Sequence, residues 1–251
     1  MQELPEIKGI FERNDVKIRE LEGMKEEKNW WGEALEKDFT HIVENGIKYK
    51  VDFVNGQKTG YFLDQKYNRQ AVAKIAKGRK VLDCFTHTGS FALNAIKGGA
   101  ERVTAVDISE DALKMARENA ELNGWKLETV AANVFDLLTK MTDEHNKDYD
   151  FIILDPPAFT KSGATVASAT RGYKEINRKA MKLLPRGGYL ATCSCSHFMK
   201  EEFFVQMLKE AAADAAVSLR QIEARQQAPD HPILWNVPET NYLKFYIFQI
   251  V

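Results

Sequence analysis

The sequence predicts an α/β protein with a mostly parallel, doubly wound, Rossmann-like sheet that follows a small N-terminal β-meander. From Lys80 onward, short apolar segments alternate with segments of helical periodicity, and this order favours parallel strands joined by helices. The run at 151–154 is apolar throughout, as expected for a strand covered on both faces. The stretch 80–91, KVLDCFTHTGSF, adds a strand, a tight turn and the start of a helix. In such a sheet, ligands bind beyond the carboxyl ends of the strands.

The first 62 residues are predicted to form a separate N-terminal part. Residues 1–38 are charged and weakly patterned, and we interpret them as an extended arm or linker. Apolar and polar residues then alternate from Thr40, and the pairs Asn45-Gly46 and Asn55-Gly56 are typical of tight turns between strands. The predicted division is therefore an arm with a β-meander at 1–62 and the larger α/β domain at 63–251.

The elements of the larger domain follow from their end signals. Asp64 is a candidate N-cap for a helix that ends before Gly78, and Ser109 is a candidate N-cap for a helix that ends at Asn123-Gly124. Further helices are predicted at 91–99, 173–184 and 201–215, and strands at 80–83, 101–107, 127–133, 150–155, 189–195 and 242–250.

Composition excludes several classes of protein. The net charge is −1 with 28% charged residues, so nucleic-acid binding would require a local basic face. Three cysteines are too few for a disulfide framework or a zinc site, which favours a reducing compartment and no metal. No run approaches the roughly 18 apolar residues that span a membrane, and the N-terminus lacks a secretory pattern. We expect a soluble cytoplasmic protein without a membrane partner, and a homodimer is left open.

The turn after the first strand of the sheet is a candidate cofactor loop. Its single glycine, Gly89, contrasts with the three of G-x-G-x-x-G, so a nucleotide-like ligand without phosphates fits better than a dinucleotide. S-adenosylmethionine (SAM) is such a ligand. An ordinary strand-to-helix turn is the alternative. The candidate residues are Asp83, Phe85, Thr86, Gly89, Ser90 and Phe91.

The next two strands also end in polar residues. Asp107 lies 18 residues after Gly89, where a carboxylate can accept both ribose hydroxyls, and Ile108 follows it. Asn133, followed by Val134, could place its side-chain amide at the adenine edge. The alternatives are an aspartate that only precedes a helix and an asparagine that only forms a turn.

The fourth strand ends in Asp155-Pro156-Pro157-Ala158-Phe159. Two prolines fix φ and hold Asp155 in place, and Phe159 is available to stack on a planar base. This turn favours methyl transfer to a nitrogen or carbon of a nucleobase or amide, and an ordinary proline-rich turn is the alternative. At the end of the fifth strand, Cys195 could form an exposed thiolate, and Cys193 would lie on the same side if the strand stays regular.

Six motifs in this order, KTGYFLDQKYNR, DCFTHTGSF, AVDIS, DPPAF, RGYKEIN and CSCS, resemble the bacterial 23S ribosomal-RNA cytosine-C5 methyltransferases. The resemblance implies a class I SAM-dependent methyltransferase fold with Cys195 as the nucleophile and Asp155 on the N3 side of the cytosine. It also implies that Gln65 and Arg69 close over the methionine end of SAM, and that Asp155 and Pro156 contribute to the cofactor site. Known members begin with a small RNA-binding domain of the PUA type; the given sequence starts just past where that domain would end, so we expect either a fragment or a short homologue.

The chemistry agrees with that implication. A thiolate that attacks C6 activates C5 of cytosine toward the methyl group, and the base must first leave its stack. RNA would be held by local charge and aromatic rings. The candidate RNA residues are Pro157, Phe159, Lys161, Arg171, Tyr173 and Lys174.

The sequence therefore predicts a SAM-dependent RNA methyltransferase that forms 5-methylcytosine, with 23S rRNA as the expected partner. The main alternative is methylation of guanine N7 or N2 by a related enzyme that has the same D-P-P turn and needs no thiol. A non-catalytic module that binds SAM or RNA is an alternative of another class, and methyl transfer to a small molecule is a third.

Overall fold

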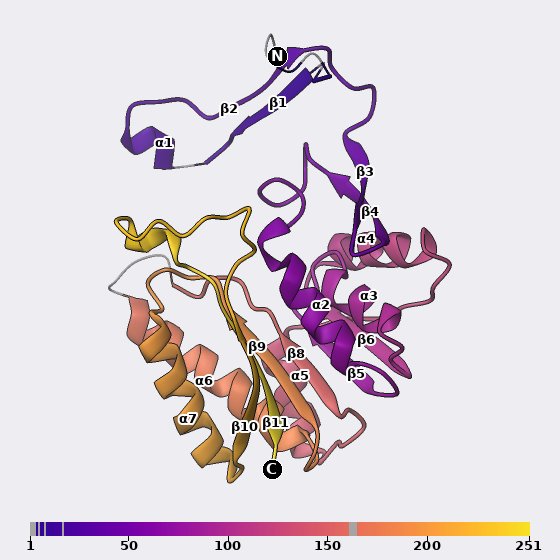
Figure 1. Cartoon of the computed structure of the whole chain (residues 1–251), viewed down its shortest axis with the longest axis vertical. Helices are drawn as coiled ribbons and strands as arrows, with labels where there is room; N and C mark the ends of the chain where they lie inside the picture. The colour runs from indigo at the N-terminus through magenta and orange to yellow at the C-terminus, as the bar shows by residue number, and fades with distance from the viewer. Residues whose placement is uncertain (1–3, 5, 8, 17, 161–164) are drawn as a thin grey trace. The chain divides into compact units, whose positions relative to one another are not determined.

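The computed structural model describes residues 4, 6–7, 9–16, 18–160 and 165–251. It divides into two compact units, Met1–Phe62 and Leu63–Val251, which have the bounds of the two predicted parts. Figure 1 shows the elements of each unit along the chain.

The first unit contains a hairpin that the sequence did not indicate. Strands β1 (Gly9–Asn14) and β2 (Glu27–Gly32) pair antiparallel, and the short helix α1 (Ile18–Leu21) lies between them. The rings of Phe11, Trp30 and Phe53 form a cluster with centroids 5.0 to 5.8 Å apart. The prediction of an extended arm at 1–38 was wrong, because this aromatic cluster stabilises strands that have little alternation of their own.

The predicted meander is a single hairpin. Strands β3 (Phe39–Glu44) and β4 (Ile47–Asp52) are joined by Asn45 and Gly46, whose φ angles are 54° and 70°. The prediction of a strand after Asn55-Gly56 was wrong. Asp52 Oδ1 accepts hydrogen bonds from the backbone N–H groups of Val54 and Asn55, so β4 ends in a tight turn instead.

The second unit is an α/β domain built on a seven-stranded sheet with the order β10-β11-β9-β8-β5-β6-β7. The strands β5 to β9 are parallel, and β11 is antiparallel to its neighbours β9 and β10. The bounds are β5 (Lys80–Cys84), β6 (Arg102–Asp107), β7 (Glu128–Ala131), β8 (Phe151–Leu154), β9 (Tyr189–Ser194), β10 (Leu219–Arg225) and β11 (Lys244–Ile250). The mostly parallel, doubly wound sheet is confirmed, and β10, which is polar and largely exposed, was not predicted.

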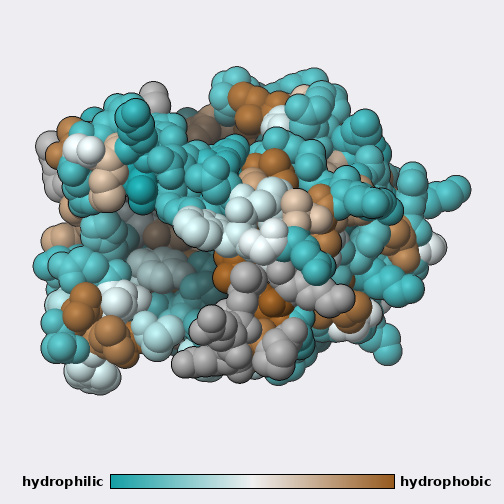
Figure 2. Space-filling model, turned by 90° about the horizontal axis from the view of Figure 1, so that it is seen from above, coloured by the Kyte–Doolittle hydropathy of each residue, from teal (hydrophilic) through white to brown (hydrophobic). Residues whose placement is uncertain are grey.

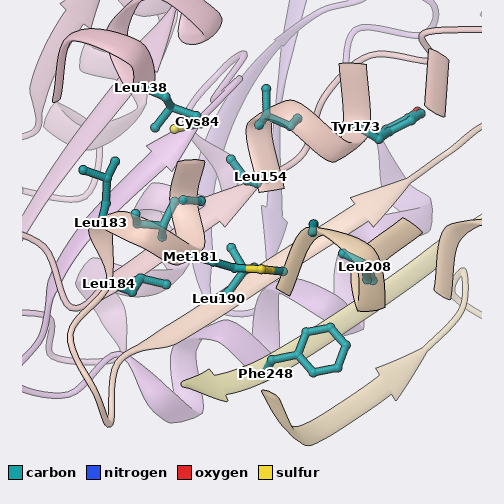
Figure 3. Close-up of a cluster of buried hydrophobic side chains, with 14 of the residues drawn as sticks. Cys84, Leu138, Leu154, Tyr173, Met181, Leu183, Leu184, Leu190, Leu208 and Phe248 are labelled. Carbon is teal, nitrogen blue, oxygen red and sulfur yellow. The ribbon is translucent and has the colours of Figure 1, made fainter. Parts of the chain in front are cut away.

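Helices cover both faces of this sheet. The bounds are η1 (Leu63–Gln65), α2 (Lys66–Ile75), α3 (Ser90–Lys97), α4 (Glu110–Glu121), α5 (Val134–Asp143), α6 (Val166–Leu183), α7 (Glu201–Ala215) and η3 (Pro238–Thr240). One core cluster joins α5, α6 and α7 to the sheet and includes Leu138, Met181 and Leu208 (Figure 3). A second cluster joins α2 and α3 to the sheet and includes Val72, Phe91 and Phe245.

Helix ends test the capping predictions. Ser109 caps α4, since its Oγ accepts a hydrogen bond from Ala112 N at 3.2 Å. The N-cap prediction for Asp64 was wrong, because Leu63–Gln65 forms a 3-10 turn and the carboxylate of Asp64 accepts a hydrogen bond from the Tyr242 hydroxyl. Helix α5 was not predicted, and α6 begins at Val166, seven residues before the predicted start at Tyr173.

The surface in Figure 2 is mainly hydrophilic, with hydrophobic residues in small separate groups. None of the helices in the described part of the chain is both long and apolar enough to span a lipid bilayer. The described residues also contain no cluster of three or more His, Cys, Asp or Glu side chains that could hold a metal ion.

Candidate functional site

The carboxyl ends of the parallel strands β5 to β9 meet at one edge of the sheet. The chain leaves β5 for β6 on one side, while β8 lies on the other, so the strand order reverses beside β5. Such a reversal is where open α/β sheets bind their ligands. Three aspartates and two cysteines lie at or next to the ends of β5, β6, β8 and β9: Asp83, Asp107, Asp155, Cys193 and Cys195.

Asp83 shapes the loop after β5. Its Oδ2 accepts hydrogen bonds from Thr86 Oγ1 at 2.6 Å and from Ala92 N at 2.9 Å. The side chain is fully buried, and this burial raises the pKa of Asp83 to about 7. Its Oδ1 is buried and has no hydrogen-bond partner within the described part of the chain. Asp83 therefore holds the loop in place through one oxygen, while the other has no partner in the described part of the chain.

The loop that follows is tightly wound. Phe85, His87 and Gly89 have positive φ angles of 62°, 51° and 83°. A Cβ on Gly89 would lie 2.9 Å from Ala116 Cβ of α4, so this position needs glycine for packing as well as for its backbone conformation. Burial lowers the pKa of His87. Ser90 begins α3, and Phe91 is buried in the core beneath it.

Asp107 is held by the backbone at the end of β6. Its Oδ2 accepts a hydrogen bond from His87 N at 2.9 Å, and its Oδ1 accepts one from Ser109 N at 3.0 Å. Each carboxylate oxygen keeps acceptor capacity for a further donor. The neighbouring Ile108 is 74% exposed, so a large apolar side chain lies beside this carboxylate.

Asn133 caps helix α5, since its Oδ1 accepts a hydrogen bond from Phe135 N at 2.9 Å. This capping role was not predicted, and the cap uses one acceptor site of the side-chain amide. The side chain of Val134 is 3% exposed and packs in the core, so only its backbone is available to a ligand.

Asp155, after β8, is held by side chains from two other segments. Its Oδ1 accepts hydrogen bonds from Cys193 Sγ at 2.9 Å and from Gln65 Nε2 at 3.2 Å. Gln65 is itself oriented by Asn68, whose Nδ2 donates to Gln65 Oε1 at 2.7 Å. Burial raises the pKa of Asp155 to about 6, although the nearby charge of Arg69 opposes the shift. The carboxyl group is thus poised to carry a proton near neutral pH.

Arg69 extends the cluster on the side of α2. The side chain is 1% exposed, and its guanidinium lies 5.9 Å from the centroid of the Phe91 ring. The structure therefore brings Gln65, Arg69 and Asp155 together. Their roles toward SAM stay predictions.

The two cysteines of β9 lie in different environments. Cys193 is 1% exposed, donates its S–H to Asp155, and has a pKa raised well above its ordinary value, mainly by burial. Cys195 follows the last residue of the strand, Ser194, and is only partly buried. Both side chains contact the core cluster that contains Phe245. Of these two thiols, Cys195 is the one with exposed surface.

The predicted RNA residues divide into three groups. Arg171 and Pro157 are exposed, and Phe159 is partly buried against the rings of Phe85, Phe135 and Tyr173. Tyr173 is fully buried, and its hydroxyl accepts a hydrogen bond from Ser194 Oγ at 3.1 Å. Because Tyr173 is buried, we no longer assign it as an RNA contact. Its ring packs against the ring of Phe159 instead.

The charge of Lys174 is used within the protein. Its Nζ lies 3.3 Å from Glu210 Oε2 and 3.0 Å from Asp214 Oδ2, both on α7. Lys174 thus has acidic partners within the protein, and its role as an RNA contact stays a prediction. Lys161 lies outside the described residues.

Two functional candidates were missed in the sequence. The Tyr242 hydroxyl donates to Asp64 Oδ2 at 2.7 Å, and Lys244 Nζ donates to the carbonyl of Ser196 at 2.6 Å. Lys244 is the first residue of β11 and Tyr242 lies two residues before it. Because β11 runs antiparallel to β9, its amino end reaches the carboxyl edge of the sheet. Recognition of the last strand as antiparallel would have placed them there.

Comparisons with known proteins agree with this geometry. The family model of the S-adenosylmethionine-dependent methyltransferases matches residues 25–249. The protein named ribosomal RNA large subunit methyltransferase I from Aeromonas salmonicida is 45% identical over 94% of this chain and 60% of its own length. The protein of the same name from Vibrio vulnificus is 41% identical over 96% of this chain and 62% of its own length. The chain thus spans about three fifths of the length of these curated relatives.

A solved structure described as a candidate methyltransferase complexed with SAH superimposes with a TM-score of 0.78. It is 26% identical and covers 87% of this chain and 57% of its own chain.

Proposed function

Because the chain belongs to the S-adenosylmethionine-dependent methyltransferases, we propose that it methylates C5 of a cytosine in large-subunit (23S) ribosomal RNA. The printed names of the relatives at 41% to 45% identity support ribosomal RNA as the substrate. The partly exposed thiol of Cys195, next to the Cys193–Asp155 hydrogen bond, supports the C5 position and is the observation that carries the proposal. A ribosomal RNA substrate also favours the cytoplasm as the location.

The residues at the ends of β5 and β6 fit SAM. The buried Asp83 Oδ1 without a described partner and the acceptor capacity of Asp107 suit a ligand with several donors. The exposed Ile108 offers an apolar surface to a purine ring. We assign the ribose hydroxyls to Asp107 and the methionine end to Gln65 and Arg69. When bound, SAM supplies an electrophilic methyl group that C5 accepts.

Cys195 supplies the nucleophile. Its thiolate attacks C6 of the cytosine, which makes C5 electron-rich, and it leaves again after C5 has lost its proton. Cys193 is less suited to this role, because burial and its hydrogen bond to Asp155 both keep the thiol protonated. Cys193 is thus a positioning residue for Asp155, and the partly exposed thiol of Cys195 performs the attack.

Asp155 supports the negative charge that develops on the ring. With a pKa raised to about 6, a fraction of the carboxyl groups is protonated at neutral pH and donates a proton toward N3. Gln65 and Cys193 fix its orientation from two sides. The cytosine has to leave its stack to reach this position, and Phe159 and Pro157 lie on the same turn to receive it.

Transfer of a tritiated methyl group from SAM to 23S rRNA tests the proposal, with bisulfite sequencing to locate 5-methylcytosine. We expect transfer by the unaltered protein and at least a thousandfold loss in Cys195→Ala, with the Kd for SAM unchanged. Cys84→Ala is the matched control, because it removes a buried thiol from the other core cluster. Undiminished transfer by Cys195→Ala would favour guanine methylation, and no transfer by the unaltered protein would favour a binding module.

A further inference from the structure

Lys244 contacts the turn that carries Cys195 from two directions. Its backbone pairs with Ser194, the residue before Cys195, in the antiparallel register of β11 and β9. Its Nζ donates a hydrogen bond to the carbonyl of Ser196, the residue after Cys195, at 2.6 Å. A second bond from Nζ reaches the carbonyl of Tyr242 at 2.8 Å. The lysine therefore holds both neighbours of the candidate nucleophile.

The Lys244 side chain is buried without a carboxylate partner. It is 5% exposed, and in the described part of the chain no carboxylate oxygen lies within 4.0 Å of Nζ. Its two hydrogen bonds go to neutral carbonyls. Burial makes an ammonium group costly, so Lys244 would stabilise an anion that forms close to it during function.

Three groups interact electrostatically with Lys244 and are therefore the candidates for this anion. They are Cys195 and Cys193 from β9 and the turn after it, and Glu201 from α7. The carboxylate of Glu201 accepts a hydrogen bond from the Tyr246 hydroxyl, and Cys193 donates to Asp155. Of the three, Cys195 is the group placed to become an anion in the reaction cycle.

We propose that the ammonium group of Lys244 stabilises the thiolate of Cys195 and positions it through the carbonyl of Ser196. This inference rests on the proposed function of Cys195 as the nucleophile. The Cys195 thiol loses its proton to solvent, while Lys244 keeps its own proton and remains the cation. Lys244 is thus a positioning residue that acts through Cys195.

The pH range of this effect follows from the burial of Lys244. Desolvation lowers the pKa of Lys244 to about 8, while the electrostatic effects of Cys195 and Glu201 oppose the shift. At pH 7 the lysine is therefore mostly protonated and stabilises the thiolate. Above about pH 8 it loses its proton, and its stabilisation of the thiolate is lost.

The test measures the thiolate directly, without RNA. The intact protein is alkylated with iodoacetamide at a series of pH values, and modification of the Cys195 peptide is quantified by mass spectrometry. We expect a pH midpoint below the roughly 8.5 of an unperturbed cysteine in the unaltered protein. Lys244→Met should raise the midpoint by about one pH unit, which lowers alkylation at pH 7 about tenfold. Lys244→Arg should retain most of the effect.

Lys209→Met is the matched control, since it removes an exposed lysine of α7 and should leave the midpoint unchanged. An unshifted midpoint in folded Lys244→Met would overturn the inference, as would an unaltered-protein midpoint at or above 8.5. If Lys244→Met does not fold, Lys244→Gln, which keeps donors for the carbonyls, is expected to show the same shift. Failure of the proposed function is seen separately, as methyl transfer that persists in Cys195→Ala.

Discussion

The two halves of the carboxyl edge are held in place in different ways. In the β5–β6 half, Asp83 and Asp107 are fixed by hydrogen bonds from the segments that follow β5 and β6, such as those from Ala92 N and Ser109 N. In the β8–β9 half, Asp155 is fixed by side chains 90 and 38 residues away in the chain, Gln65 and Cys193. The first half is a local structure and the second depends on the assembled domain. We infer that the first half binds the adenosyl part of the cofactor, and that the second half, where Gln65 meets Asp155, holds its methionine end and performs the chemistry.

The largest expected effect is the loss of kcat when Asp155, in the β8–β9 half, is substituted. Asp155→Asn keeps the shape of the side chain but cannot exchange a proton, so we expect kcat to fall about 10²- to 10⁴-fold. The Kd for SAM, measured by calorimetry, should change by less than about threefold. An equal loss of SAM affinity would show that the two halves do not act separately.

The second prediction concerns Asp83 and the way its raised pKa makes protein stability depend on pH. Its pKa is raised to about 7 by burial, whereas an unfolded aspartate has a pKa of about 3.9. Between these values the folded protein binds more protons than the unfolded chain, so the stability that Asp83 contributes is lost as pH rises from about 4 to 7. Asp83→Asn removes this loss and should exceed the unaltered protein in stability by at most about 4 kcal/mol at pH 8.

Urea unfolding at pH 4 and pH 8 measures this difference. The gain should be small at pH 4, where the carboxyl group is protonated in both states of the unaltered protein. A difference between the two proteins that is the same at both pH values would contradict a raised pKa.

Asp107 should affect binding more than catalysis. Asp107→Asn removes the charge to which we assign the ribose hydroxyls, and we expect the Kd for SAM to rise about 10- to 100-fold. At saturating SAM, kcat should stay within about threefold of the unaltered protein. A large fall in kcat with unchanged Kd would reverse the roles assigned to the two halves.

The smallest effect concerns the packing of the cofactor loop. Gly89→Ala introduces a Cβ 2.9 Å from Ala116 Cβ at a φ of +83°, so we expect a loss of about 1–2 kcal/mol in stability. In the double variant with Ala116→Gly, the contact is relieved while the backbone strain remains. A double-mutant cycle by urea unfolding should show a favourable coupling between the two positions, and zero coupling would contradict the contact.

The same comparison explains what the sequence could predict. The β5–β6 half, the Ser109 cap and the all-buried strand β8 depend on neighbouring residues, and the local pattern indicated them. The Gln65–Asp155–Cys193 contacts depend on segments far apart in the chain, and only the family resemblance pointed to Gln65. Burial of Tyr173 and the ion pairs of Lys174 arise from packing of α6 on α7, which a local pattern does not show.

Covalent trapping tests the assignment of Cys195 most directly. RNA transcribed with 5-fluorocytidine carries fluorine in place of the C5 proton, so the enzyme cannot complete elimination and the thioether at C6 persists. We predict a denaturation-resistant adduct on the Cys195 peptide, formed by the unaltered protein and by Cys193→Ala but absent from Cys195→Ala. An adduct on Cys193, or one that persists in Cys195→Ala, would contradict the account.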